Sequence, residues 1–131
     1  MIIGKVRDFG EFSLEPRVQI ELAHLVDGYR SYDALLDSGF NGCIALPRKL
    51  AEELRSIPGA TYTLVDAEGD EIEQEAIVGY MRFHGLERHV DVHIMDGPFP
   101  DILLGLEVLK GYQVCMEIVD NGQITIELIS S

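Results

Sequence analysis

Alternation of apolar and polar residues recurs along most of the chain, and this is the pattern of strands that bury one face. It is clearest at residues 18–22, which read Val-Gln-Ile-Glu-Leu. Residues 32–36 end in Ala-Leu-Leu, which is apolar on both faces and is therefore expected inside the fold. The pattern predicts an all-β fold. The predicted strands cover residues 18–22, 32–36, 43–46, 61–65, 72–83, 90–95, 114–119 and 124–129.

Two short segments depart from this alternation and favour helices. Pro47 suits the first position of a helix, and Leu50 and Leu54 after it would share one helical face. We therefore predict helices over residues 47–55 and 106–110, with a Pro-Gly pair ending the first helical unit.

Turn-forming residues separate these elements, and no linker or repeat divides them. We expect turns at residues 27–28, 67–70, 85 and 121–122. With 131 residues, the chain suits a single domain covering residues 1–131, which can bury a core without a metal or a disulfide.

Charge limits the possible partners of the protein, and cysteine content indicates its compartment. The chain has 23 acidic and 10 basic side chains, a formal net charge of −13. Binding to phosphate groups needs clustered Lys and Arg, so we expect neither nucleic acid nor a membrane as a partner. No apolar run approaches the roughly 20 residues of a membrane span, and no signal peptide is evident. Two cysteines far apart indicate a reducing compartment, so we expect a cytoplasmic protein.

The most unusual position is Asp37, a carboxylate placed directly after an apolar strand. A buried charge without a partner is costly, so this side chain must leave the core or be held by nearby donors. Ser38 and Gly39 provide a hydroxyl, free N–H groups and a flexible backbone. Taken alone, the Asp-Ser-Gly tripeptide is more typical of an ordinary turn at a strand end than of a catalytic site.

The surroundings of this tripeptide resemble the catalytic loop of retropepsin-like (clan AA) aspartic proteases. Residues 34–42 place Asp-Ser-Gly after an apolar strand, and residues 44–47 form a second short strand. Residues 97–109, with Ile-Leu-Leu-Gly before a short helix, are similar to the second element of that family. The hairpin at 67–70 falls where the family has its flap. The likeness covers residues 17–129 and is strongest to short prokaryotic members.

This resemblance implies a small closed barrel of the acid-protease type and an aspartic endopeptidase. Two positions depart from the common family pattern: Ser38 replaces a more frequent Thr, and Phe40 replaces a small residue. The implied catalytic residues are Asp37, Ser38 and Gly39, and the implied substrate-binding residues are Phe40, Asn41, Ala67, Glu68 and Gly69.

A homodimer follows from the same resemblance, because Asp-Ser-Gly occurs once in the chain. The reaction needs two carboxylates that share a proton, one accepting a proton from water and the other donating one to the carbonyl oxygen. Two copies of one loop can supply them across a two-fold axis. No cofactor or metal is needed, and the substrate is a peptide or protein. The alternative is a catalytically silent dimeric module that binds extended peptides.

The sequence gives weaker support to other candidate functional sites than to the Asp37 segment. His89, Asp91 and His93 alternate on a predicted strand and could bind zinc, but a polar solvent face explains the same spacing. Cys43 has apolar neighbours typical of packing, and Cys115 lies on a predicted strand, so neither indicates a nucleophile. Ser38 lacks the Gly-x-Ser-x-Gly elbow of serine hydrolases.

Overall fold

The computed structural model describes residues 1–11, 13–65, 67–98 and 101–129, and most of them lie in strands, as the alternation predicts. The strands are β1 (Ile2–Asp8), β2 (Leu14–Ala23), β3 (Tyr29–Leu36), β4 (Ile44–Pro47), β5 (Ser56–Val65), β6 (Glu71–Phe83), β7 (Leu86–Met95), β8 (Leu103–Leu104), β9 (Tyr112–Met116) and β10 (Gln123–Leu128). The helices are α1 (Arg48–Ala51) and α2 (Leu106–Leu109).

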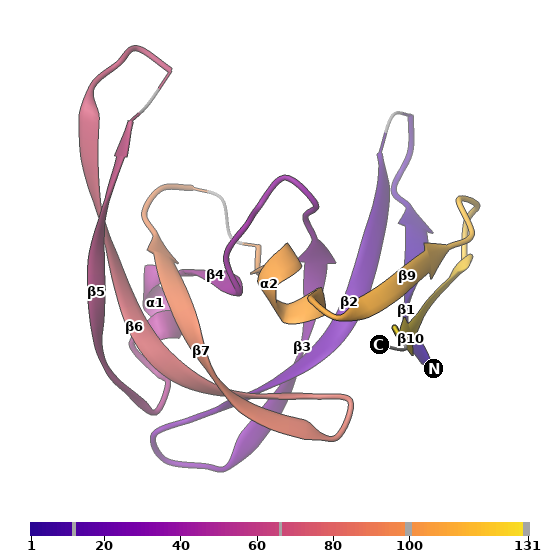
Figure 1. Cartoon of the computed structure of the whole chain (residues 1–131), viewed down its shortest axis with the longest axis horizontal. Coiled ribbons are helices and arrows are strands. Elements are labelled where there is room, and N and C mark those ends of the chain that lie inside the picture. Colours follow the sequence, from indigo (N-terminus) through magenta and orange to yellow (C-terminus); the bar gives the residue numbers. More distant parts are fainter. Residues whose placement is uncertain (12, 66, 99–100, 130–131) are drawn as a thin grey trace.

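Within the described residues, all strands belong to one sheet in the order β5-β6-β7-β4-β8-β3-β2-β1-β10-β9 (Figure 1). A further antiparallel pairing joins β2 to β6, where Glu21 pairs with Arg82 and Leu22 with Met81. It links the two arms of the sheet, so β6, β7, β4, β8, β3 and β2 form a ring of strands. The ring agrees with the predicted architecture, while a closed barrel in the strict sense stays a prediction.

The inward faces of these strands form one apolar core. On β7, Val90, Val92 and Ile94 are buried while His89 and Asp91 are exposed, which confirms the alternation expected for this strand. The largest fully buried side chains come from the ring strands β2, β4, β6, β7 and β8 and from β1 and β10; they are Ile3, Ile20, Leu22, Ile44, Leu46, Met81, Leu104, Ile124, Val6, Val18, Val90 and Val92.

The first helix is shorter than the prediction over residues 47–55. Pro47 is the last residue of β4 rather than a helical residue, and α1 ends at Ala51. Leu54 instead forms an isolated bridge with His24, and the Arg55 N–H donates to the carbonyl of Ala23. Tertiary pairing with the end of β2 therefore overrides the local helical propensity of this segment.

The Pro-Gly pair after this helix does not end the unit as predicted. Pro58 and Gly59 lie inside β5, whose register with β6 shifts between Pro58 and Thr61. Proline is tolerated there because β5 is an edge strand and the ladder is irregular at this point. The second helix agrees with its prediction within one residue, since α2 ends at Leu109 and Gly111 follows with φ +92°.

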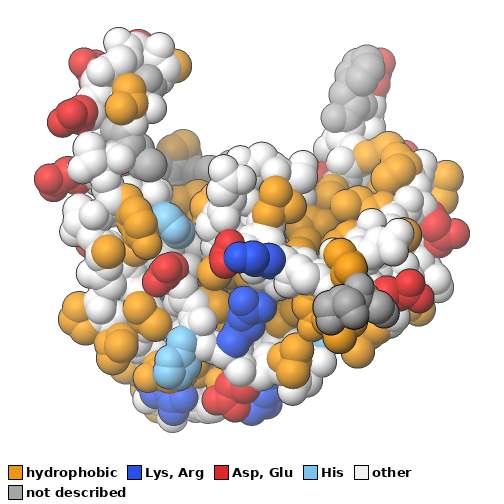
Figure 2. All heavy atoms as spheres, in the orientation of Figure 1, with side chains coloured by type: hydrophobic (Ala, Val, Ile, Leu, Met, Phe, Trp, Pro, Cys, Tyr) orange, Lys and Arg blue, Asp and Glu red, His pale blue; other side chains and the backbone are white. Residues whose placement is uncertain are grey.

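Two hairpins project on the same side of the molecule (Figures 1 and 2). One joins β5 to β6, and the other joins β1 to β2. The loop after β3 lies between them, at the floor of the recess that Figure 2 shows. Acidic side chains gather on the β5–β6 projection in Figure 2, which agrees with the four glutamates and one aspartate at 68, 70, 71, 73 and 75.

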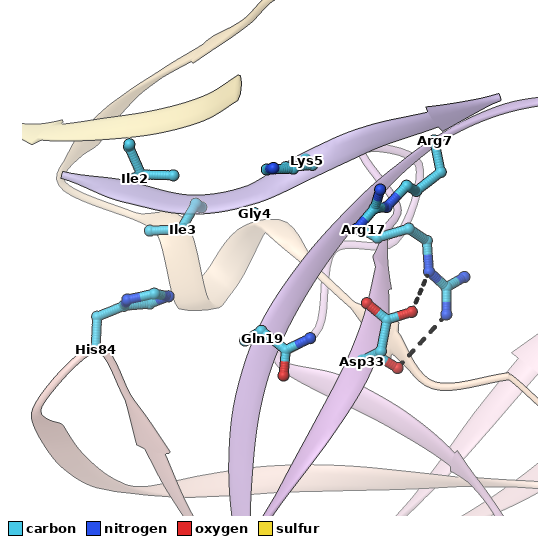
Figure 3. A pocket seen from close by; sticks show the side chains of 9 residues that line it. All are labelled: Ile2, Ile3, Gly4, Lys5, Arg7, Arg17, Gln19, Asp33 and His84. Atoms are coloured by element: carbon cyan, nitrogen blue, oxygen red, sulfur yellow. Dashed lines mark hydrogen bonds and ion pairs between the residues drawn. The ribbon is translucent and has the colours of Figure 1, made fainter. Parts of the chain in front are cut away.

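A partly buried arginine, Arg17, joins three segments of the chain, and Figure 3 shows its bonds to Asp33. The Arg17 side chain is 12% exposed, and its Nη1 and Nη2 donate to both carboxylate oxygens of Asp101 at 2.7 and 2.9 Å. Its Nε donates to Asp33 Oδ2 at 2.8 Å. Bidentate charge-assisted bonds of this kind are stronger than neutral hydrogen bonds and hold the two groups in one geometry. They therefore hold the segment that enters β8 to β2 and β3.

None of the described helices combines the length and the apolar character needed to cross a membrane.

Candidate active site

Asp37 stands at the end of β3, held by main-chain bonds to β8. Its N–H donates to the carbonyl of Leu104 at 2.9 Å, and the Leu35 N–H donates to the carbonyl of Ile102 at 2.8 Å. These bonds belong to the parallel pairing of β3 with β8. The carboxylate therefore leaves a buried strand at a position fixed by its own backbone.

The turn after Asp37 orients its carboxylate. The Gly39 N–H donates to Asp37 Oδ1 at 2.9 Å, and the Phe40 N–H donates to the Asp37 carbonyl at 3.1 Å. The Asp37 side chain is half-buried, whereas Ser38 and Gly39 are exposed. The turn expected from the tripeptide is thus present, and it leaves Asp37 partly accessible to solvent.

The returning half of the loop is fastened to the start of α2. The N–H groups of Gly105, Leu106 and Glu107 donate to the carbonyls of Cys43, Phe40 and Gly42 at 2.8, 3.0 and 3.3 Å. Both ends of the Asp37 loop, which we define as residues 37–43, are therefore bonded to residues 104–107. The two motifs that suggested the family are in direct contact.

This contact depends on the absence of a side chain at Gly105. A Cβ placed there would lie 2.0 Å from the carbonyl oxygen of Gly42 and 2.8 Å from that of Phe40. Both obstacles are backbone atoms, which cannot rotate away. Only glycine fits at this position.

A pocket of about 600 Å³ opens beside the Asp37 loop. The loop, β4 and β8, β7, α2 and the β5–β6 hairpin each supply part of its wall, which is mainly apolar with a few polar groups. Such a lining is typical of ligand sites. Its residues are Phe40, Asn41, Gly42, Cys43, Ala45, Tyr62, Gln74, Asp91, His93, Met95, Leu103 and Glu107.

His93 lines this pocket and contacts three of its other lining residues. Its Nδ1 lies 3.0 Å from Gln74 Oε1, its ring stacks on Tyr62 with centroids 5.0 Å apart, and it meets Phe40 edge-on at 5.4 Å. Burial lowers the pKa of His93, and the nearby Asp91 carboxylate opposes this effect. The ring is consequently held in its neutral form more strongly than a free imidazole.

The predicted substrate-binding residues divide into two groups. Phe40 and Asn41 line the pocket, but the hairpin-tip residues Ala67, Glu68 and Gly69 do not; they are exposed at the end of the β5–β6 projection. Asp66, which directly precedes these residues, lies outside the described residues. The strands of the hairpin, rather than its tip, reach the pocket in this structure.

Sequence reasoning missed the pocket residues contributed by strands far apart in the chain, above all Tyr62, Gln74 and Glu107. A signal existed for His93, which the alternation on its strand singled out, although zinc binding was the chemistry considered. His93 instead bonds Gln74, and the described residues contain no group of three or more His, Cys, Asp or Glu placed to hold a metal ion.

Cys43 lies in the pocket wall but lacks the setting of a nucleophile. Its side chain is buried, and burial raises the pKa of its thiol. A protonated thiol is a poor nucleophile, so Cys43 serves packing, as its neighbours indicate. Cys115 is exposed on β9.

Comparison with known proteins identifies the fold. No protein-family model and no curated protein sequence matches the chain. Among solved structures, a retropepsin-like aspartic protease from Rickettsia conorii matches with TM-score 0.61 and 18% identity, over 96% of this chain and 89% of that one. The EIAV protease in complex with the inhibitor HBY-793 matches with TM-score 0.52 and 18% identity, over 79% and 92%.

The protease of simian foamy virus (mac) matches with TM-score 0.51 and 21% identity, over 72% of this chain and 96% of that one. The chain therefore has a retropepsin-like fold, as the resemblance of its motifs implied.

Proposed function

We propose that the chain is one subunit of a homodimeric aspartic endopeptidase, with Asp37 as the catalytic residue. The observation that carries this proposal is the Asp37 turn: a carboxylate at the end of a buried strand, fixed by Gly39 and Leu104, beside a large pocket. The solved structures with this fold are described as proteases, and this supports the same class of reaction.

The chemistry needs the Asp37 side chains of two subunits at a two-fold axis. Two carboxylates about 3 Å apart do not both ionise easily, so they hold one proton between them. One then accepts a proton from the attacking water, while the other donates a proton to the carbonyl oxygen of the peptide. Ser38 of each loop would brace the two loops, and Gly39 would offer backbone contacts.

The substrate in this proposal is an extended peptide lying across both loops. Phe40 and Asn41 would contact its side chains, and the pocket would take one of them. The tips of the two β5–β6 hairpins, residues 67–69, would close over the peptide, for which the positive φ of Gly69, +86°, provides a tight turn. The two unpaired thiols, Cys43 and Cys115, fit the cytoplasmic location that we propose.

The test is cleavage of a diverse peptide mixture between roughly pH 4 and pH 8, a range that spans carboxylate titration. The Asp37→Asn variant should lose at least about a hundredfold in rate, because an amide cannot exchange the proton. Asp120→Asn is a matched control, since Asp120 is exposed near the β9–β10 turn and an amide oxygen can keep its bond to the Asp8 N–H.

Wild-type cleavage that vanishes in Asp37→Asn and persists in Asp120→Asn would establish the activity and report its specificity. Equal cleavage by Asp37→Asn, or no cleavage by a wild-type protein shown to be dimeric, would refute the proposed function.

A further inference from the structure

We propose that His93 is a positioning residue that couples the β5–β6 hairpin to the Asp37 loop. Its two sides contact the two segments separately. On one side, Nδ1 meets Gln74 of β6 and the ring stacks on Tyr62 of β5. On the other, the ring contacts Phe40, and Nε2 lies 3.0 Å from the point where a Cβ at Gly42 would be.

His93 lies at the position in the sheet where contacts can hold the projecting hairpin. The ladder between β6 and β7 ends at the pair Ala76–His93. Beyond it, among the described residues, residues 61–65 and 71–75 pair only with each other. His93 therefore stands where the hairpin leaves the sheet, and its side chain extends the attachment past the last main-chain pair. Hairpins without further support are marginally stable, so this attachment sets how firmly the projection is held.

The coupling is expected to depend on pH. The titratable groups around the imidazole are Asp91 on β7, Tyr62 on β5, Cys43 on the loop side and Glu107 on α2, while Gln74 and Phe40 are uncharged. Burial lowers the pKa of His93 despite Asp91. An opened hairpin exposes the imidazole to water, and it then takes up a proton at about pH 6.5. The closed arrangement is thus fully stable above about pH 6.5 and weakens as the pH falls below it.

In catalytic terms the inference rests on the proposed function. A hairpin released from the loop would bind the peptide less firmly, so loss of His93 would raise KM more than it lowers kcat. The physical coupling itself can be measured without any substrate.

The experiment is amide hydrogen exchange on the full chain at about pH 7.5 and about pH 5, expressed as protection factors. Variants are His93→Gln, which removes the ring, and His93→Phe, which keeps stacking but cannot titrate. His89→Gln is the matched control, because His89 lies on the same strand, four residues before His93, and is exposed against Tyr80. The same proteins are assayed for peptide cleavage.

At neutral pH, His93→Gln should lower protection in residues 61–75 and in the Asp37 loop by roughly fivefold, about the effect of losing one net hydrogen bond. Wild type should lose protection in both segments at acid pH, and His93→Phe should remove this pH dependence. Losses confined to β7, equal losses in β1 and β10, or the same result from His89→Gln would overturn the proposal. If hydrogen exchange changes as expected but the wild-type protein cleaves no peptide, the proposed function is refuted. The coupling between the hairpin and the Asp37 loop is then still supported.

Discussion

Gly105 shows how closely the two segments of the candidate site approach each other. Its backbone N–H bonds the Cys43 carbonyl while its Cα faces the carbonyls of Phe40 and Gly42. A side chain at this position has no room, because its Cβ would meet the carbonyl oxygens of Gly42 and Phe40 and also the ring of Phe40. The close spacing between the Asp37 loop and α2 thus requires that position 105 carry a hydrogen atom in place of a Cβ.

Gly105→Ala should therefore destabilise the protein by about 3 kcal/mol, the cost of forcing a methyl group into a filled space. Urea unfolding followed by far-ultraviolet circular dichroism measures the change in the free energy of unfolding. Gly28→Ala is the control, since nothing lies within 4 Å of a Cβ placed there. An equal loss in both variants would show that the contact at Gly105 is unimportant.

Sequence reasoning succeeded and failed at neighbouring residues for physical reasons. Asp37 was found because its signal is local: a carboxylate following an apolar strand and preceding Ser-Gly. His93 acquires its surroundings from the parallel pairing of β4 with β7 and from a hairpin some twenty residues earlier in the chain. Pairings over such distances leave no pattern at the residue itself. The zinc hypothesis arose because alternation reveals a shared face but not what covers it.

At the scale of elements, the Arg17 network links the strand that carries Asp37 to the strand that supports it. Arg17 pairs with Leu35 in the β2–β3 ladder, and its side chain reaches Asp101, one residue before Ile102. Asp101 is also held by its own turn, in which the Ile102 N–H donates to its Oδ1 at 2.8 Å. The hydrogen bond from Arg17 lowers the pKa of the Asp101 carboxyl, and burial opposes this effect.

The lowered pKa predicts a pH dependence. Because the folded pKa lies below the unfolded value of about 3.9, the pair contributes its full stability above that pH and loses it as the pH falls through the folded pKa. Asp101→Asn should cost about 1–3 kcal/mol near neutral pH, and the difference from wild type should shrink below about pH 3.9. Urea titrations at several pH values measure it.

Asp27→Asn serves as the comparison, because the Asp27–Arg30 pair is exposed at a turn and surface pairs contribute at most about 1 kcal/mol. A pH-independent deficit in Asp101→Asn would mean that the carboxylate charge is not what stabilises this junction.

The same scale explains the error in the first helix. Residues 48–54 have good helical propensity, yet the segment makes one turn and then pairs Leu54 with His24. Propensity is worth tenths of a kcal/mol per residue, less than the burial of Leu54 against the end of β2. Short elements between strands are therefore predicted in kind more reliably than in extent. The long strand β6 was predicted to within one residue, whereas β2, β5 and β7 begin several residues before their predicted starts and β1 was not predicted.

At the scale of the whole molecule, charge opposes the association that the proposed function needs. Each subunit carries a formal net charge of −13, so two copies repel each other. Salt shortens the range of this repulsion, from a Debye length of about 10 Å at 0.1 M to about 3 Å at 1 M. We therefore expect the dimer dissociation constant to fall several-fold when salt is raised over this range.

Sedimentation equilibrium at several salt concentrations measures the dissociation constant, and cleavage per subunit should rise in parallel. Asp37→Asn protein should dimerise as well as wild type, which separates assembly from chemistry. A protein that stays monomeric at every salt and protein concentration would contradict the two-fold site.

The fastening of the Asp37 loop also bears on how this architecture persists through evolution. The bonds that hold it join N–H and carbonyl groups of residues 37–43 and 104–107, and every amino acid except proline carries both groups. Most side chains around the loop can therefore be substituted without moving the carboxylate, as long as position 105 remains glycine. Related proteins can therefore keep this geometry after their sequences have diverged beyond recognition. Structural similarity then persists longer than sequence similarity.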